Sequence, residues 1–200
     1  MQNYILKTAI RNFMRNKSFA FINIIGLAVG IASCLLIYSI IKFELSFDTF
    51  HTNKDNIYRV ISEFKSEEGS RFSSGVPFPV ADALRIDYPQ LIKVADIYRT
   101  PDVQISILDK KINETEKKFK ETNGVFFTEP EFFEMFDIEL LTGNYSSLGE
   151  PNNALLTQET AEKYFGNWEE ALGKTIMYDN SKEFKVAGIL KNIPSNSDFP

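Results

Sequence analysis

The chain has 200 residues, of which 44% are hydrophobic and 24% are charged, and its formal net charge is -5. A disordered or low-complexity protein is excluded, because 18 Phe and 8 Tyr supply ample side chains for a core. The charges are unevenly distributed. All 27 acidic residues lie at or after Glu44, whereas the first 17 residues hold no acid and four basic residues, namely Lys7, Arg11, Arg15 and Lys17. This division predicts a chain that lies at a boundary between two environments.

The single cysteine, Cys34, and the single histidine, His51, limit the chemistry of the chain. They exclude a disulfide framework, a zinc site built from Cys and His, and a catalytic His/Cys pair within the chain. Function is therefore expected to follow from architecture.

An uncharged apolar segment of 24 residues runs from Ser18 to Ile41. As an α-helix it would reach about 36 Å, and the hydrocarbon core of a bilayer is about 30 Å thick. We therefore predict a transmembrane helix in residues 18–43, after a cytoplasmic segment of residues 1–17. The positive-inside rule then places residues 44–200 outside the cell membrane.

Two other interpretations of this segment stay open. A buried helix of a soluble protein can be equally apolar, although such helices usually carry a polar stripe. Residues 31–34 (IASC) look like a lipoprotein cleavage site, which would place a lipid on Cys34. Against cleavage, the apolar run continues to Ile41, where a lipoprotein would normally turn polar.

Small residues four apart recur within the predicted span. Gly26 and Gly30 form a GxxxG pair, and Ala28 and Ala32 repeat the spacing. Small residues at this spacing share a helix face and allow a second helix to approach closely. We predict that these four residues pack against other membrane helices.

The segment before the span has an amphipathic pattern. Apolar residues between Ile5 and Met14 recur at helical spacing, and basic residues lie on the opposite side. An in-plane helix on the cytoplasmic membrane surface is predicted, with its cations at anionic lipid headgroups, namely Lys7, Arg11, Arg15 and Lys17. The alternative is a basic flank that only fixes the topology.

The predicted fold class is α+β: an N-terminal amphipathic helix, one transmembrane helix and then a mixed α/β domain in residues 44–200. β-rich or alternating segments predict strands at 56–64, 94–99, 103–108, 122–127, 154–157, 174–178 and 183–190. Helical spacing predicts helices at 79–88, 129–136 and 158–165, with a helical turn at 168–172. The last two strands are expected to form a hairpin around Asp179 and Asn180.

Candidate sites for chemistry are few. The run Gly173-Lys174-Thr175 has Trp168 where a phosphate-binding loop requires glycine, so a tight turn into a strand is predicted. His51 lies near Asp48 without a placed nucleophile, which favours a local hydrogen-bond motif over a catalytic pair. The acidic outer segment argues against nucleic-acid binding. We predict no catalytic, cofactor-binding or metal-binding residue.

Several groups of residues carry a family pattern. Around the apolar segment they are AIRNF (9–13), NK (16–17), FINIIGLAVGIA (21–32) and ELSFDTFH (44–51). Farther along they are IYRV (57–60), LLT (155–157), YFG (164–166), GKTI (173–176), VAGIL (186–190) and IPSNS (193–197). Each group is short, but together and in this order they closely resemble the start of MacB-like or FtsX-like ABC transporter permeases, particularly the Bacteroidetes-type forms. The resemblance covers nearly the whole chain.

The resemblance implies a permease subunit of a bacterial inner membrane, with a MacB-like periplasmic core domain in residues 44–200. It also implies three further membrane helices after residue 200, a second permease copy, and a separate cytoplasmic ABC ATPase that binds the ATP. Closure of the ATPase would then move the periplasmic domains and export or extract a substrate. The chain itself would need no cofactor, and the substrate is not identified.

Two alternatives from other classes were weighed. A single-pass membrane-anchored binding or sensor domain predicts a natural end near residue 200. A membrane-anchored hydrolase requires a nucleophile and a base that the sequence does not display.

Overall fold

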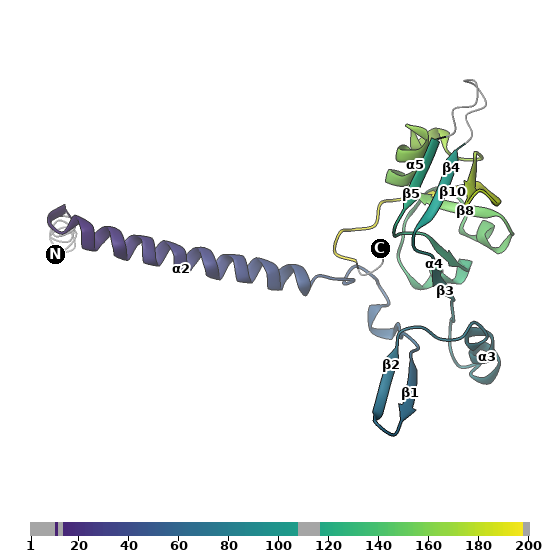
Figure 1. Cartoon of the computed structure of the whole chain (residues 1–200), viewed down its shortest axis with the longest axis horizontal. Helices are drawn as coiled ribbons and strands as arrows, with labels where there is room; N and C mark the ends of the chain where they lie inside the picture. The colour runs from purple at the N-terminus through teal and green to yellow at the C-terminus, as the bar shows by residue number, and fades with distance from the viewer. Residues whose placement is uncertain (1–10, 12–13, 108–116, 198–200) are drawn as a thin grey trace. The chain divides into compact units, whose positions relative to one another are not determined.

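The computed structural model describes residue 11 and residues 14–107 and 117–197. It divides the chain into two compact units, Met1–Phe47 and Asp48–Pro200. Each unit is described by itself (Figure 1).

The first unit contains the long helix α2, Lys17–Glu44, of 28 residues. It begins after Asn16, whose φ of -120° and ψ of 56° are not helical. Within the described residues, α2 is the one helix long and apolar enough to cross a bilayer. None of its most apolar window is buried by the part of the chain that the structure describes.

Two serine hydroxyls within α2 are satisfied by the helix itself. The Oγ of Ser33 donates to the carbonyl of Val29 at 2.9 Å, and the Oγ of Ser39 donates to that of Leu35 at 2.8 Å. Such bonds leave no hydroxyl unpaired in a surrounding of lipid tails, where an unpaired polar group is costly.

The second unit is built on a six-stranded mixed sheet. Its strands follow the order β5-β4-β9-β10-β7, and β8 also pairs with β10. The β8–β10 pair is parallel and the other pairs are antiparallel. The strands are β4 (Val103–Ile107), β5 (Lys117–Glu121), β7 (Leu140–Gly143), β8 (Asn153–Thr157), β9 (Thr175–Tyr178) and β10 (Lys182–Leu190).

Two helices cover parts of this sheet. Helix α5 (Gln158–Phe165) packs Ala161 and Tyr164 into the main core, which the 3-10 turn η3 (Trp168–Glu170) borders. Helix α4 (Pro130–Met135) buries Phe132 in a second core beside the end of β10. The main core combines residues of β4, β8, β9, β10 and α5. Of these, α5, β4, β8 and β10 are labelled together in the upper part of the domain in Figure 1.

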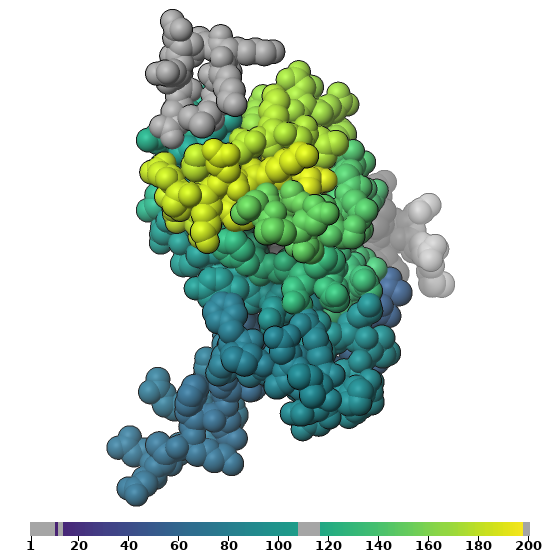
Figure 2. Space-filling model, turned by 90° about the vertical axis from the view of Figure 1, so that its right-hand side faces the viewer, coloured from purple at the N-terminus to yellow at the C-terminus, as the bar shows by residue number. Residues whose placement is uncertain are grey.

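A smaller lobe precedes and flanks this sheet. It holds the hairpin of β1 (Ser62–Ser66) and β2 (Gly69–Ser73), helix α3 (Val80–Asp87), and the pair of β3 (Ile97–Arg99) with β6 (Phe126–Thr128). Within this domain the hairpin projects from the lower edge in Figure 2, where its residues are blue. Phe64 and Phe72 are exposed on it. Phe72 pairs with Glu63, the residue before Phe64, so the two rings lie on opposite faces of the hairpin. Two 3-10 turns complete the unit, η1 (Lys54–Asn56) and η2 (Tyr145–Gly149).

The α+β fold class is confirmed, and so are the predicted helices near α3, α4 and α5. The hairpin of β9 and β10 is also confirmed. Tyr178 pairs with Lys182, so residues 179–181 form the loop. Asp179 and Asn180 have positive φ, 43° and 52°, and the N–H of Ser181 donates to the carbonyl of Tyr178 at 3.0 Å, as in a type I′ turn.

Other predicted strands were wrong in extent or missing. The strand predicted for residues 56–64 is wrong up to residue 61, because the ladder begins at Ser62, where a partner strand lies alongside. The strands predicted at 94–99 and 122–127 shorten or shift to β3 and β6. Strands β2, β5 and β7 were not predicted.

Candidate functional site

The predicted helix-packing residues lie on two separate faces of α2. A Cβ added to Gly26 or Gly30 would meet no heavy atom within 4 Å, and Ala28 and Ala32 are exposed. A step of two residues turns an α-helix by about 200°, so the alanine pair lies nearly opposite the glycine pair. Asn23 lies three residues before Gly26, on the glycine face.

The predicted membrane-surface residues flank the start of α2. Arg11, Arg15 and Lys17 are exposed, and Arg11 and Arg15 have helical backbone. Lys7 lies outside the described residues.

A buried histidine lies at the start of the outer domain. His51 is only 5% exposed, and its ring packs against Phe50, at 4.1 Å between centroids, and against Phe136, at 5.1 Å. Its Nδ1 accepts a hydrogen bond from the backbone N–H of Asp137 at 3.1 Å. The Nε2 atom therefore carries the ring proton in the neutral form, and it lies 4.0 Å from Oδ1 of Asp48.

The neighbours of this histidine join three distant parts of the domain. The carboxylate of Asp48 accepts from the hydroxyl of Ser197 at 2.8 Å, and the backbone N–H of Asp48 donates to the carbonyl of Asn196 at 3.0 Å. The carboxylate of Asp137 accepts from the backbone N–H of Thr52, which holds the pKa of Asp137 below its ordinary value. We call the group Asp48, His51, Thr52, Asp137 and Ser197 the His51 latch.

The latch does not have the arrangement of a catalytic triad. A general base needs a free ring nitrogen within hydrogen-bond reach of a nucleophile. Here Nδ1 of His51 is occupied by a backbone amide, and Nε2 faces a carboxylate. The predicted hydrogen-bond motif describes this geometry better than a catalytic pair.

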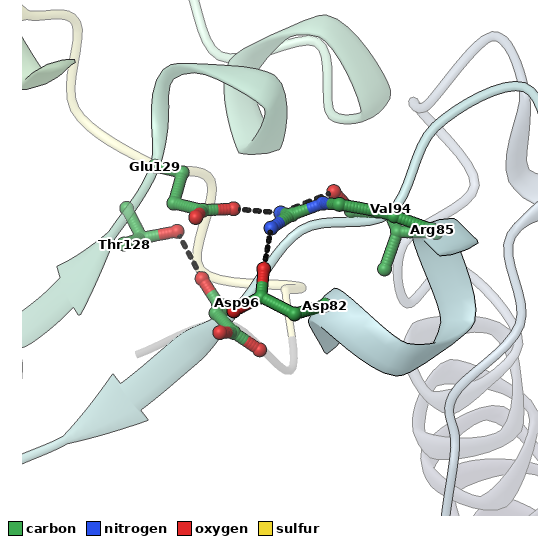
Figure 3. Close-up of polar contacts among 6 residues, drawn as sticks. All are labelled: Asp82, Arg85, Val94, Asp96, Thr128 and Glu129. Carbon is green, nitrogen blue, oxygen red and sulfur yellow. Dashed lines mark hydrogen bonds and ion pairs between the residues drawn. The ribbon is translucent and has the colours of Figure 1, made fainter. Parts of the chain in front are cut away.

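A second polar cluster fastens helix α3 to the segment before α4 (Figure 3). The guanidinium of Arg85 donates to Asp82 at 2.9 Å, to the carbonyl of Val94 at 2.9 Å, and to Glu129. Burial raises the pKa of Asp96, and the nearby charge of Glu129 adds to this effect. One guanidinium thus holds together three segments of the smaller lobe.

The Gly173-Lys174-Thr175 run forms the predicted turn into a strand. Gly173 has φ +79° and donates its N–H to the carbonyl of Val186, and Thr175 opens β9. The amine of Lys174 lies 5.3 Å from the ring centre of Phe165. Over the described ranges, no group of three or more His, Cys, Asp and Glu side chains is placed to bind a metal ion.

Comparisons with known proteins point to one family. A comparison with curated proteins gave no match. A solved domain from Porphyromonas gingivalis, provisionally described as part of a permease, is 24% identical, with a TM-score of 0.46. The similarity covers 60% of this chain and 52% of that one, so this chain spans about half its length. The family model of the MacB-like periplasmic core domain matches residues 20–200. The chain therefore belongs to the family of MacB-like periplasmic core domains, which are parts of ABC transporter permeases.

Proposed function

We propose that the chain is the N-terminal part of a permease subunit in an ABC transporter of the mechanotransmission type. A cytoplasmic ATPase would hydrolyse ATP, and the permease would convert its closure into movement of the periplasmic domain that exports or extracts a substrate. The observation that carries this proposal is the extent of the family match. It begins inside α2 and continues to residue 200, so the apolar helix and the outer domain belong to one family unit.

The length and surface of α2 support its place in the membrane. At about 1.5 Å per residue, its 28 residues span about 42 Å, more than the hydrocarbon core of a bilayer. Large apolar side chains are exposed along the helix, for example Phe21, Leu27 and Leu36 at 65–66%. Lipid tails are the natural surrounding for such a surface. The basic residues before α2 favour a cytoplasmic N-terminus and a periplasmic outer domain.

The small residues on two faces of α2 favour a helix that has neighbouring helices on both sides. A lone anchor gains nothing from glycine, which lowers helix propensity. A helix with small residues on opposite faces suits a position between two other membrane helices. We assign these neighbours to further helices of the permease and to a second permease copy.

The connection between α2 and the outer domain is short. Helix α2 ends at Glu44 and the second unit begins at Asp48. The backbone N–H groups of Leu45 and Ser46 still bond to the last turn of the helix, at 2.9 and 3.0 Å. Phe43 and Phe47 pack edge to face, with ring centres 5.2 Å apart. A short connection with local contacts is suited to passing on a displacement of the helix.

Co-purification from the native host tests this proposal. The encoding gene carries a tag, and the membranes are solubilised in mild detergent. We expect an ABC ATPase and a second, differently tagged copy to co-purify. Recovery of the chain without any ATPase under all mild conditions would contradict the proposal and favour an anchored binding or sensor domain.

Variants of α2 test the two faces in the same experiment. Gly26→Leu with Gly30→Leu blocks one face, and Ala28→Leu with Ala32→Leu blocks the other. Each double variant is expected to lower recovery of a partner. At about 100° per residue, Val29 lies midway between the centres of the two faces, so the control Val29→Leu is expected to leave recovery unchanged.

A further inference from the structure

We propose that the His51 latch is a pH-sensitive fastening, in which protonation of His51 releases the backbone of Asp137. The latch closes the start of the outer domain onto the end of α4 when the ring is neutral. Acid opens that contact. The consequence for coupling rests on the proposed function, but the latch itself is a property of this chain.

Nδ1 is the acceptor atom of the neutral ring. Nδ1 of His51 can accept the N–H of Asp137, at 3.1 Å, only while it carries no proton. An imidazolium has a donor at both nitrogens, so a protonated ring would set an N–H against an N–H at this position. Protonation of the buried ring would thus leave the amide of Asp137 without its partner at Nδ1.

Two carboxylates lie near the ring of His51. Asp48 faces Nε2 at 4.0 Å, and the carboxylate of Asp137 also acts on the ring. The carboxylate of Asp137 stays charged in mild acid, because the amide of Thr52 lowers its pKa. The hydrogen bond that protonation of the ring would break is the one from the Asp137 N–H to Nδ1.

The other elements near the ring add little charge. On α4, Glu134 is paired with Lys93, and beyond Asp137 the carboxylate of Glu139 is paired with Lys191 at 2.8 Å. Residues 193–197 carry no charge, and Phe50 and Phe136 offer only aromatic surface. In the turn η1, Lys54 and Asp55 are exposed. Asp48 and Asp137 are therefore the charges that govern the latch.

The position of the latch gives its opening a specific effect. It joins residues 48–52, which directly follow the first unit, to residues 136–137 and 196–197. Release of the Asp137 amide loosens the first of these segments from the end of α4, while the bond from Thr52 to the Asp137 carboxylate and the bonds between Asp48 and residues 196–197 can persist. In the proposed transporter, acid would loosen the outer domain at residues 48–52, the segment that directly follows the first unit and would receive the displacement of α2.

Nuclear magnetic resonance of the full chain in detergent micelles tests this latch. His51 is the single histidine, so its ring signals need no assignment among others. At pH 8 the ring nitrogens are expected to show the neutral form protonated at Nε2. Amide exchange is measured at pH 8 and pH 5, the range in which histidine changes charge, and is corrected for intrinsic rates. Protection of the Asp137 amide, relative to that of Val186 in the core, is expected to fall at least about tenfold.

His51→Gln is the matched control. Its side-chain oxygen can accept the Asp137 amide, but glutamine does not titrate, so protection is expected to be similar at both pH values. Unchanged protection of Asp137 in the wild-type chain while the ring titrates would overturn the proposal, as would an equal loss in His51→Gln. If the variant does not fold, the wild-type titration decides alone. The samples contain no ATPase, so failure here is distinct from failure of the co-purification.

Discussion

Substitution of Gly143 by alanine is expected to weaken the outer domain strongly. Gly143 lies opposite Gly188 where β7 meets β10, and its φ is +96°. A Cβ there would lie 2.3 Å from the carbonyl oxygen of Ala187 and 2.4 Å from the Cα of Gly188. Both are backbone atoms, so relief requires the two strands to separate.

The expected cost has two parts. The left-handed backbone costs an alanine about 1–2 kcal/mol, and overpacking adds about 1–3 kcal/mol. The sum of about 2–5 kcal/mol is a large share of the roughly 5–15 kcal/mol by which a domain is typically stable. Gly166→Ala is the matched control, because Gly166 has φ +84° but nothing within 4 Å of an added Cβ. It is expected to show the backbone cost alone.

Urea unfolding of the full chain in micelles measures both variants. The single tryptophan, Trp168, packs against the main core, and its fluorescence reports unfolding of that core. The free energy of unfolding of Gly143→Ala is expected to fall by at least about 1 kcal/mol more than that of Gly166→Ala. Equal losses in the two variants would refute the close approach of β7 and β10.

Three further predictions concern charge. Burial, with a hydrogen bond to Glu121 at 2.8 Å, raises the pKa of Tyr164, so its stabilising contribution is present below about pH 10 and is lost above it. The unfolding free energy of the wild type should therefore fall more steeply from pH 9 to 11 than that of Tyr164→Phe; parallel curves would contradict this. The raised pKa of Asp96 means that its charge costs stability at neutral pH and not in acid. The free energy of unfolding of Asp96→Asn should therefore exceed that of the wild type at pH 7 but not at pH 3. An equal difference at both pH values would contradict this prediction. Replacing the N-terminal cations Lys7, Arg11, Arg15 and Lys17 by Glu is expected to reduce the fraction of chains with a periplasmic outer domain. A membrane-impermeant maleimide on Ser70→Cys, in a Cys34→Ser background, measures that fraction, and unchanged labelling would argue against the assigned orientation.

Elements with local sequence determinants were predicted well. The helix predicted for residues 158–165 has the observed bounds of α5. Its start is fixed by Thr157, whose side chain accepts from the N–H of Thr160, and Gly166 follows its end with positive φ. The turn of Asp179 and Asn180 likewise depends on residues within it.

Elements that depend on distant partners were missed. Strand β5 reads KKFKE, which resembles a solvated charged segment and is an edge strand rich in lysine. The alternation at residues 56–61 forms no strand because no strand pairs with it. The latch joins His51 to Asp137 across 86 residues, and no local pattern marks such a contact.

The gene itself tests the central claim most directly, by sequencing on both sides of codon 200 and translation of the frame onward. A permease predicts that the frame, directly or after a frameshift, leads into three more apolar spans of about 20 residues each. A true stop codon after residue 200, with no ABC ATPase gene nearby, would contradict the permease and leave a membrane-anchored binding domain in its place.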